Sequence, residues 1–74
     1  MKLDRITFDP NVMGGKPCLR GMRVTVSTVL KLLAGGMSRE QILSDYPYLE
    51  AGDLEQSIQY AAMLADDRVL QRAN

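Results

Sequence analysis

The residues best suited to bind an anion lie close together in a basic loop, residues 15–25 of the 74-residue chain. Lys16, Arg20 and Arg23 alternate there with glycine and proline, which disfavour a helix and allow close approach of the backbone. The loop predicts contacts with nucleic-acid phosphates or with an acidic protein. It does not contain the Gly-x-x-x-x-Gly-Lys-Ser/Thr order of a nucleotide-phosphate loop. A structural role stays open, in which the loop's apolar residues pack on the helices and its charges remain in water.

The formal net charge is zero, but the charges are unevenly divided along the chain. Residues 1–31 carry six basic and two acidic side chains, whereas residues 32–74 carry three basic and seven acidic ones. This division indicates two surfaces with different partners or a head-to-tail contact between copies of the chain. Ordinary solvated faces are the alternative interpretation.

Size and composition limit how the domain can be stabilised. A chain of this length buries only about 60% of its unfolded surface. With one cysteine and no histidine, it can form neither a disulfide framework nor a Cys/His zinc site, so we expect a homo-oligomer or a complex. Cys18 is expected to be a reduced, unreactive loop residue. The absence of a membrane span and of a signal peptide predicts a cytoplasmic location.

The elements that position the basic loop can be predicted from caps and periodicity. Two β-prone segments, residues 5–8 and 23–26, are expected to pair with each other. Three helices should follow: one from a cap at Thr25 or Ser27 to about Ala34, one from Ser38 to Pro47, and one from Glu50 to about Asp66. The residues expected to face the core are Val26, Val29, Leu30, Leu33, Ile42, Leu43, Tyr46, Leu54, Ile58, Ala61, Ala62 and Ala65.

These elements predict one mainly α domain, residues 1–74. It should comprise a strand-and-loop arm (1–26), a three-helix core (27–66) and a C-terminal extension (67–74). The predicted fold class is a three-helix, helix-turn-helix domain with a short N-terminal β element and a basic Gly/Pro loop.

The charge of the third helix argues against the usual way in which such a domain reads DNA. In a helix-turn-helix the second helix of the pair enters the major groove. Here that helix would bring Glu50, Asp53 and Glu55 toward phosphates, and residues 40–67 contain no Lys or Arg for guanine. Any DNA contact is therefore predicted for Lys16 and its neighbouring arginines instead.

Catalysis is not expected from this composition. The chain has no histidine, and its carboxylates do not show hydrolase or metal-ligand spacing. The three tyrosines are assigned to the core or to an interface. We expect no metal and no cofactor.

Residues 14–26, GGKPCLRGMRVTV, resemble the signature of the bacterial domain of unknown function 433 family. Gly36-Met37-Ser38 and Asp45-Tyr46-Pro47 extend the resemblance, which covers about residues 5–65. It implies a homeodomain-like helical domain with an N-terminal β element. It also implies the antitoxin of a type II toxin–antitoxin pair, often beside a PIN-like ribonuclease toxin. Such antitoxins generally bind their toxin, and many repress their own operon.

On this basis we expect a binding protein that occludes a PIN-like toxin by direct contact. An arginine is suited to the acidic, metal-dependent site of such a toxin, because its guanidinium pairs with carboxylates bidentately. Arg68 and Arg72 are the candidates, with apolar contacts from Tyr60, Met63 and Leu64. One alternative is a dimeric repressor that binds operator DNA through Lys16, Arg20 and Arg23, and another is a purely structural adaptor.

Overall fold

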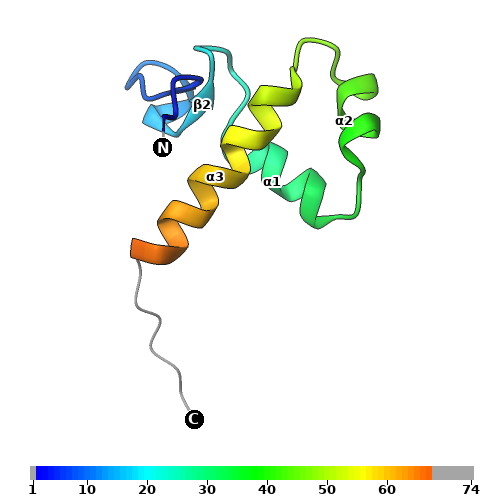
Figure 1. Cartoon of the computed structure of the whole chain (residues 1–74). Coiled ribbons are helices and arrows are strands. Elements are labelled where there is room, and N and C mark those ends of the chain that lie inside the picture. Colours follow the sequence, from blue (N-terminus) through cyan, green and yellow to red (C-terminus); the bar gives the residue numbers. More distant parts are fainter. Residues whose placement is uncertain (1, 68–74) are drawn as a thin grey trace.

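A computed structural model describes residues 2–67 of the chain. This part contains a two-stranded sheet, a short 3₁₀ helix and three α-helices (Figure 1). The elements in order are β1 (Ile6–Thr7), η1 (Met13–Gly15), β2 (Cys18–Leu19), α1 (Val26–Ala34), α2 (Arg39–Asp45) and α3 (Ala51–Asp67). The predicted mainly α domain with a short N-terminal β element is confirmed.

The two strands are antiparallel, and Ile6 lies opposite Leu19. The predicted pairing of residues 5–8 with residues 23–26 is wrong, because β2 lies between the two segments. Cys18 forms a bridge to Thr25 on the other side of β2. Cys18 is consequently a buried strand residue, 1% exposed, and the expectation that it lies in a loop is also wrong.

The helix boundaries follow the predicted caps. The Oγ1 of Thr25 accepts a hydrogen bond from the amide of Thr28 at 3.1 Å, which begins α1. The Oγ of Ser38 accepts one from the amide of Gln41 at 3.1 Å, which begins α2. These bonds satisfy helix amides that have no partner within the helix. α1 ends at a glycine pair, as predicted.

The hydrophobic core receives side chains from both strands and from all three helices. Its buried members are Ile6, Leu19, Val26, Val29, Ile42, Leu49 and Leu54. The prediction that Ala62 and Ala65 face this core is wrong, since both are exposed. They lie in the C-terminal turns of α3, which run past the rest of the fold (Figure 1).

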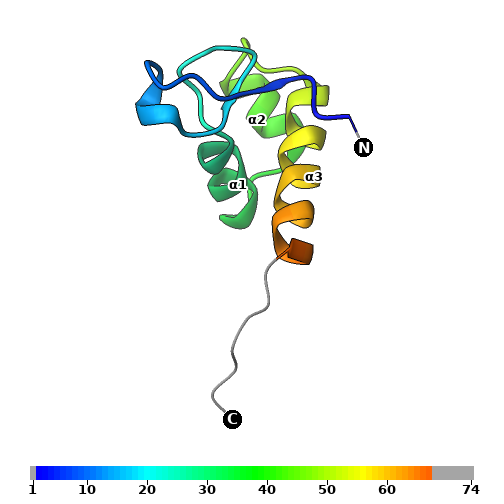
Figure 2. The ribbon, with the colours of Figure 1, turned by 90° about the vertical axis from the view of Figure 1, so that its left-hand side faces the viewer.

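The inner face of α3 also holds two polar residues, Asp53 and Ser57, whose side chains are completely buried. The Ser57 hydroxyl donates to the backbone carbonyl of Asp53 at 2.8 Å. Seen from the side, the N-terminal segment crosses the first turns of α3 (Figure 2). Within residues 2–67, no helix has the length and apolar character needed to cross a bilayer.

Candidate functional site

Two arginines from the N-terminal arm converge on one buried carboxylate of α3. Arg20 donates from Nε to Oδ1 of Asp53 at 3.0 Å and from Nη2 to Oδ2 at 2.8 Å. Arg5 donates from Nη1 to the same Oδ1 at 3.1 Å and to Glu50 Oε1 at 2.7 Å. We call these four residues the arginine–aspartate cluster. Asp53 is inaccessible to solvent, whereas each arginine side chain is about one-third exposed.

A tight turn after β2 places Arg20 in this cluster. The amide of Met22 donates to the carbonyl of Leu19 at 2.9 Å, and the two central residues, Arg20 and Gly21, have φ values of 49° and 71°. Positive φ at both central positions is the backbone of a type I′ turn. Arg20 also donates from Nη2 to the carbonyl oxygen of Tyr48 at 2.7 Å, so its guanidinium links the turn to the α2–α3 connection.

Asp53 also organises the start of α3. Its Oδ2 accepts a hydrogen bond from the amide of Glu50 at 2.8 Å, as the third helical residue does in a capping box. Between these two residues, Gly52 leaves room for the arm. A Cβ atom at this position would lie 2.6 Å from Nε and Cζ of Arg5. Gly52 therefore allows the guanidinium to rest directly against the helix.

The cluster keeps the carboxyl of Asp53 ionised. Burial alone would raise its pKa, because a low-dielectric environment disfavours the charged form. Hydrogen bonds from Arg20, then from the Glu50 amide and from Arg5, outweigh burial and lower the pKa below its ordinary value. In return, the hydrogen bond to Asp53 raises the pKa of Arg20.

A second pair of hydrogen bonds fastens the arm to α3. The amide of Arg5 donates to Gln56 Oε1 at 2.9 Å, and Gln56 Nε2 donates to Asp4 Oδ1 at 2.7 Å. The arm thus covers one face of the first turns of α3, the helix that would approach DNA in a helix-turn-helix protein, while Ala51 and Glu55 stay exposed. The cluster joins parts of the fold to one another and uses much of the hydrogen-bonding capacity of Arg20.

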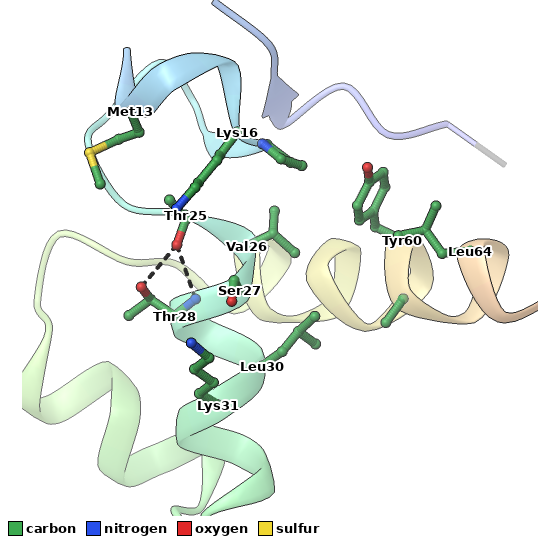
Figure 3. A pocket seen from close by; sticks show the side chains of 12 residues that line it. Met13, Lys16, Thr25, Val26, Ser27, Thr28, Leu30, Lys31, Tyr60 and Leu64 are labelled. Atoms are coloured by element: carbon green, nitrogen blue, oxygen red, sulfur yellow. Dashed lines mark hydrogen bonds between the residues drawn. The ribbon is translucent and has the colours of Figure 1, made fainter.

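A groove of about 720 Å³ lies between η1, α1 and the C-terminal half of α3 (Figure 3). We call it the α1–α3 groove. Lys16, predicted to contact nucleic acid, lines it together with Tyr60 and Leu64, which were predicted to contact a protein partner. The fold therefore brings residues from these two predicted sites to one surface.

The α1–α3 groove has two chemically different sides (Figure 3). Lys16 and Lys31 lie on one side, near the hydrogen-bonded hydroxyls of Thr25 and Thr28, whose oxygens are 2.9 Å apart. Leu30 of α1 and Tyr60 and Leu64 of α3 lie on the other side, whereas the apolar Met13 lies on the side of the lysines.

Exposed apolar side chains accompany the groove. Met13 and Leu64 line it and are 40% and 36% exposed. Phe8 is 60% exposed, and its ring centroid lies 6.1 Å from that of Tyr60. Met63, the other predicted contact on α3, is 37% exposed. Apolar surface of this kind, bordered by charged residues, is typical of interaction sites.

The remaining predicted site residues lie elsewhere. Arg23 is exposed and forms no ion pair with any residue of the described part of the chain. Arg68 and Arg72 lie outside the described residues. Among the side chains of residues 2–66, no three acidic or cysteine side chains lie close enough together to hold a metal ion.

Sequence reasoning missed the roles of Arg5, Asp53 and Gln56. The position of Asp53, three residues after Glu50, did indicate a helix cap. No local pattern indicated its arginine partners, which lie 48 and 33 positions away.

Fold and site together define a small three-helix domain whose N-terminal arm is fastened to α3 and whose α1–α3 groove is open to solvent. The chain belongs to the DUF433 family, described as proteins of unknown function, whose sequence profile matches residues 6–61. The resemblance of residues 14–26 to this family is therefore confirmed.

The chain is similar to two further proteins, one in sequence and one in structure. The chain is 38% identical over 56 residues to the uncharacterized protein y4eO of Sinorhizobium fredii (strain NBRC 101917 / NGR234), covering 76% of this chain and 25% of that protein. The crystal structure of a DUF433 member protein from Anabaena variabilis ATCC 29413 superposes with a TM-score of 0.77 at 28% identity. That match covers 85% of this chain and 62% of the Anabaena chain. The chain thus spans a quarter of the first relative and under two-thirds of the second.

Proposed function

We propose that this chain is a protein-binding domain that acts as an antitoxin, neutralising a PIN-like ribonuclease toxin by direct contact and catalysing no reaction of its own. The observation that carries the proposal is the α1–α3 groove, where Met13 and Leu64 stay exposed beside two lysines. The assignment to a toxin–antitoxin pair in the cytoplasm is an expectation carried over from the sequence resemblance, since the family itself is described as one of unknown function.

The proposed contact is centred on the outer face of α3. Tyr60 and Leu64 line the groove and Met63 is exposed near them, so these three residues offer the apolar centre typical of an interface. Arg68 and Arg72 follow α3 in the sequence and remain candidates for pairing with carboxylates of the toxin. Occlusion of the toxin's active site requires only binding, which is consistent with a surface that offers contacts rather than reactive groups.

Operator binding through the basic loop is the weaker alternative. Arg20 is bound to Asp53 and to a backbone carbonyl, which leaves Lys16 and Arg23 as the loop's readily available cations. Two phosphate contacts from one copy give little non-specific affinity, so a dimer would be needed. Gel shifts with the gene's own promoter over a salt series test this alternative, and binding that weakens steeply with salt would support it.

The antitoxin proposal is tested by expressing the product of the adjacent gene with and without this chain. We expect growth arrest by the adjacent product alone, and rescue together with a stable complex when both are present. Leu64→Asp places a charge in the groove and should abolish rescue, whereas Ser44→Asp adds the same charge at an exposed position of α2 and should not. Circular dichroism should show both variants folded. Rescue by Leu64→Asp equal to that of wild type would contradict the proposed contact, and a lack of rescue by wild type would contradict the proposed function.

A further inference from the structure

We propose that the α1–α3 groove receives a segment of the partner protein in which carboxylate side chains lie next to apolar ones. This inference rests on the proposed function and adds the chemistry of the partner. It derives from the charges that line the groove, from the side chains of its opposite wall and from the apolar surface that continues beyond it.

The charge of the groove favours an acidic partner. Among the described residues that line the groove, Lys16 and Lys31 are the charged ones, and none of these lining residues is a carboxylate. Among the side chains of residues 2–66, neither lysine has a carboxylate within the 4.0 Å of an ion pair. Their positive charge is therefore available to a partner, where it would steer association and favour acidic segments over basic ones.

The wall opposite the lysines favours a polypeptide over a nucleic acid. Leu30, Ala61 and Leu64 present aliphatic surface from two helices. Burying this surface against apolar side chains is favourable, whereas a phosphate backbone would have to be desolvated against it. A segment with apolar residues on one face and carboxylates on its edge satisfies both sides of the groove.

The extent of the apolar surface favours a protein over a small molecule. The groove volume, about 720 Å³, is within the usual range of small-ligand sites. Phe8 and Met63 are outside the lining, however, and they add exposed apolar area that a small ligand in the groove would leave in water. A partner that covers both the groove and these residues buries more surface, and surface burial drives protein association.

The proposal is tested with a displayed library of helical 16-residue peptides selected on immobilised protein. We expect wild type to enrich peptides that combine Asp or Glu with Leu, Ile or Phe. On the double variant Lys16→Glu/Lys31→Glu, the enrichment of these peptides should fall at least tenfold. Lys and Arg should be enriched at the peptide positions where wild type selects Asp or Glu. The control Lys2→Glu/Arg23→Glu changes the net charge equally at exposed positions outside the groove and should select the wild-type set.

Several results would overturn the inference. One is that no peptide is enriched, and another is that wild type and Lys16→Glu/Lys31→Glu select the same peptides. A third is that the selected peptides shift the NMR signals of backbone amides that lie outside the groove. Sedimentation that shows self-association abolished by Leu64→Asp would also overturn it, because a second copy would then occupy the groove. If peptides bind as expected while the adjacent gene product is not neutralised, the antitoxin proposal fails and the groove's preference stands.

Discussion

Arg20 and Asp53 form a two-point ion pair across 33 positions of sequence, with Nε and Nη2 of the guanidinium 3.0 and 2.8 Å from the two carboxylate oxygens. This pair joins the turn after β2 to the first turn of α3. The most central cation of the basic loop thereby stabilises the fold, whereas the lysines of the α1–α3 groove are available to a partner.

We expect Arg20→Lys to lower the melting temperature although it preserves the charge. A lysine ammonium cannot reproduce the planar two-point contact with Asp53 or reach the Tyr48 carbonyl at the same time. Arg23→Lys is the matched control, because Arg23 is exposed and makes no ion pair with the side chains of residues 2–66. Thermal unfolding followed by circular dichroism measures both. Equal melting temperatures for the two variants would show that the Arg20–Asp53 ion pair does not stabilise the fold.

The stability of the domain should fall in acid because of Asp53. Its folded-state pKa is lowered, so its contribution is complete above the unfolded value of about 3.9 and is lost as the pH falls through the folded value. Asp53→Asn should cost about 1–3 kcal/mol at neutral pH and flatten the pH dependence below about pH 4. Asp66→Asn removes an exposed carboxylate and should keep the slope of wild type. Urea unfolding from pH 7 to pH 2.5 measures how the free energy of unfolding depends on pH. If Asp53→Asn showed the same dependence as wild type, the loss of stability in acid would not come from Asp53.

The effect of Gly52→Ala on the free energy of unfolding should have opposite signs in wild type and in an Arg5→Ala background. In wild type the new Cβ would lie 2.6 Å from Nε and Cζ of Arg5 and displace the guanidinium from Glu50 and Asp53, so we expect lower stability. In an Arg5→Ala background that conflict is absent, and alanine should stabilise the helix by up to about 1 kcal/mol. A double-mutant cycle by urea unfolding measures the coupling. Equal stabilisation in both backgrounds would contradict the close approach of Arg5 to α3.

Ser38→Ala should destabilise the domain by about 1 kcal/mol, because it removes the oxygen that accepts from the Gln41 amide. Ser44→Ala provides the control: Ser44 is an exposed serine inside α2, and its replacement should change stability by less than about 0.5 kcal/mol. Chemical denaturation measures both. If the two substitutions had equal effects, the Ser38 cap would have no energetic role.

The parts of the fold that depend on neighbouring residues could be predicted from the sequence. The caps at Thr25 and Ser38 each bond an amide three residues away, so the local pattern contains both partners. The strand pairing could not be predicted in this way. Residues 23–26 were the predicted partner of β1, but the turn at Arg20 and Gly21 places β2 between β1 and that segment.

The candidate site was predictable in its residue types but not in its grouping. Lys16 was expected to act with Arg20, yet the fold places Lys16 beside Tyr60 and buries the charge partner of Arg20 in the core. The burial of Asp53 gave no sequence signal, because an acidic residue near a helix start is ordinarily a solvent-exposed cap. Only the tertiary arrangement decides which charges are satisfied within the chain and which remain for a partner.

Hydrogen–deuterium exchange of the complex with the adjacent gene product tests the central claim most directly. We expect slower amide exchange on complex formation in residues 26–31 and 58–64, the helical walls of the α1–α3 groove. Exchange in α2, residues 39–45, should be unchanged. Protection confined to α2 or to the basic loop, with residues 58–64 exchanging as in the free protein, would contradict the claim that this groove binds the partner.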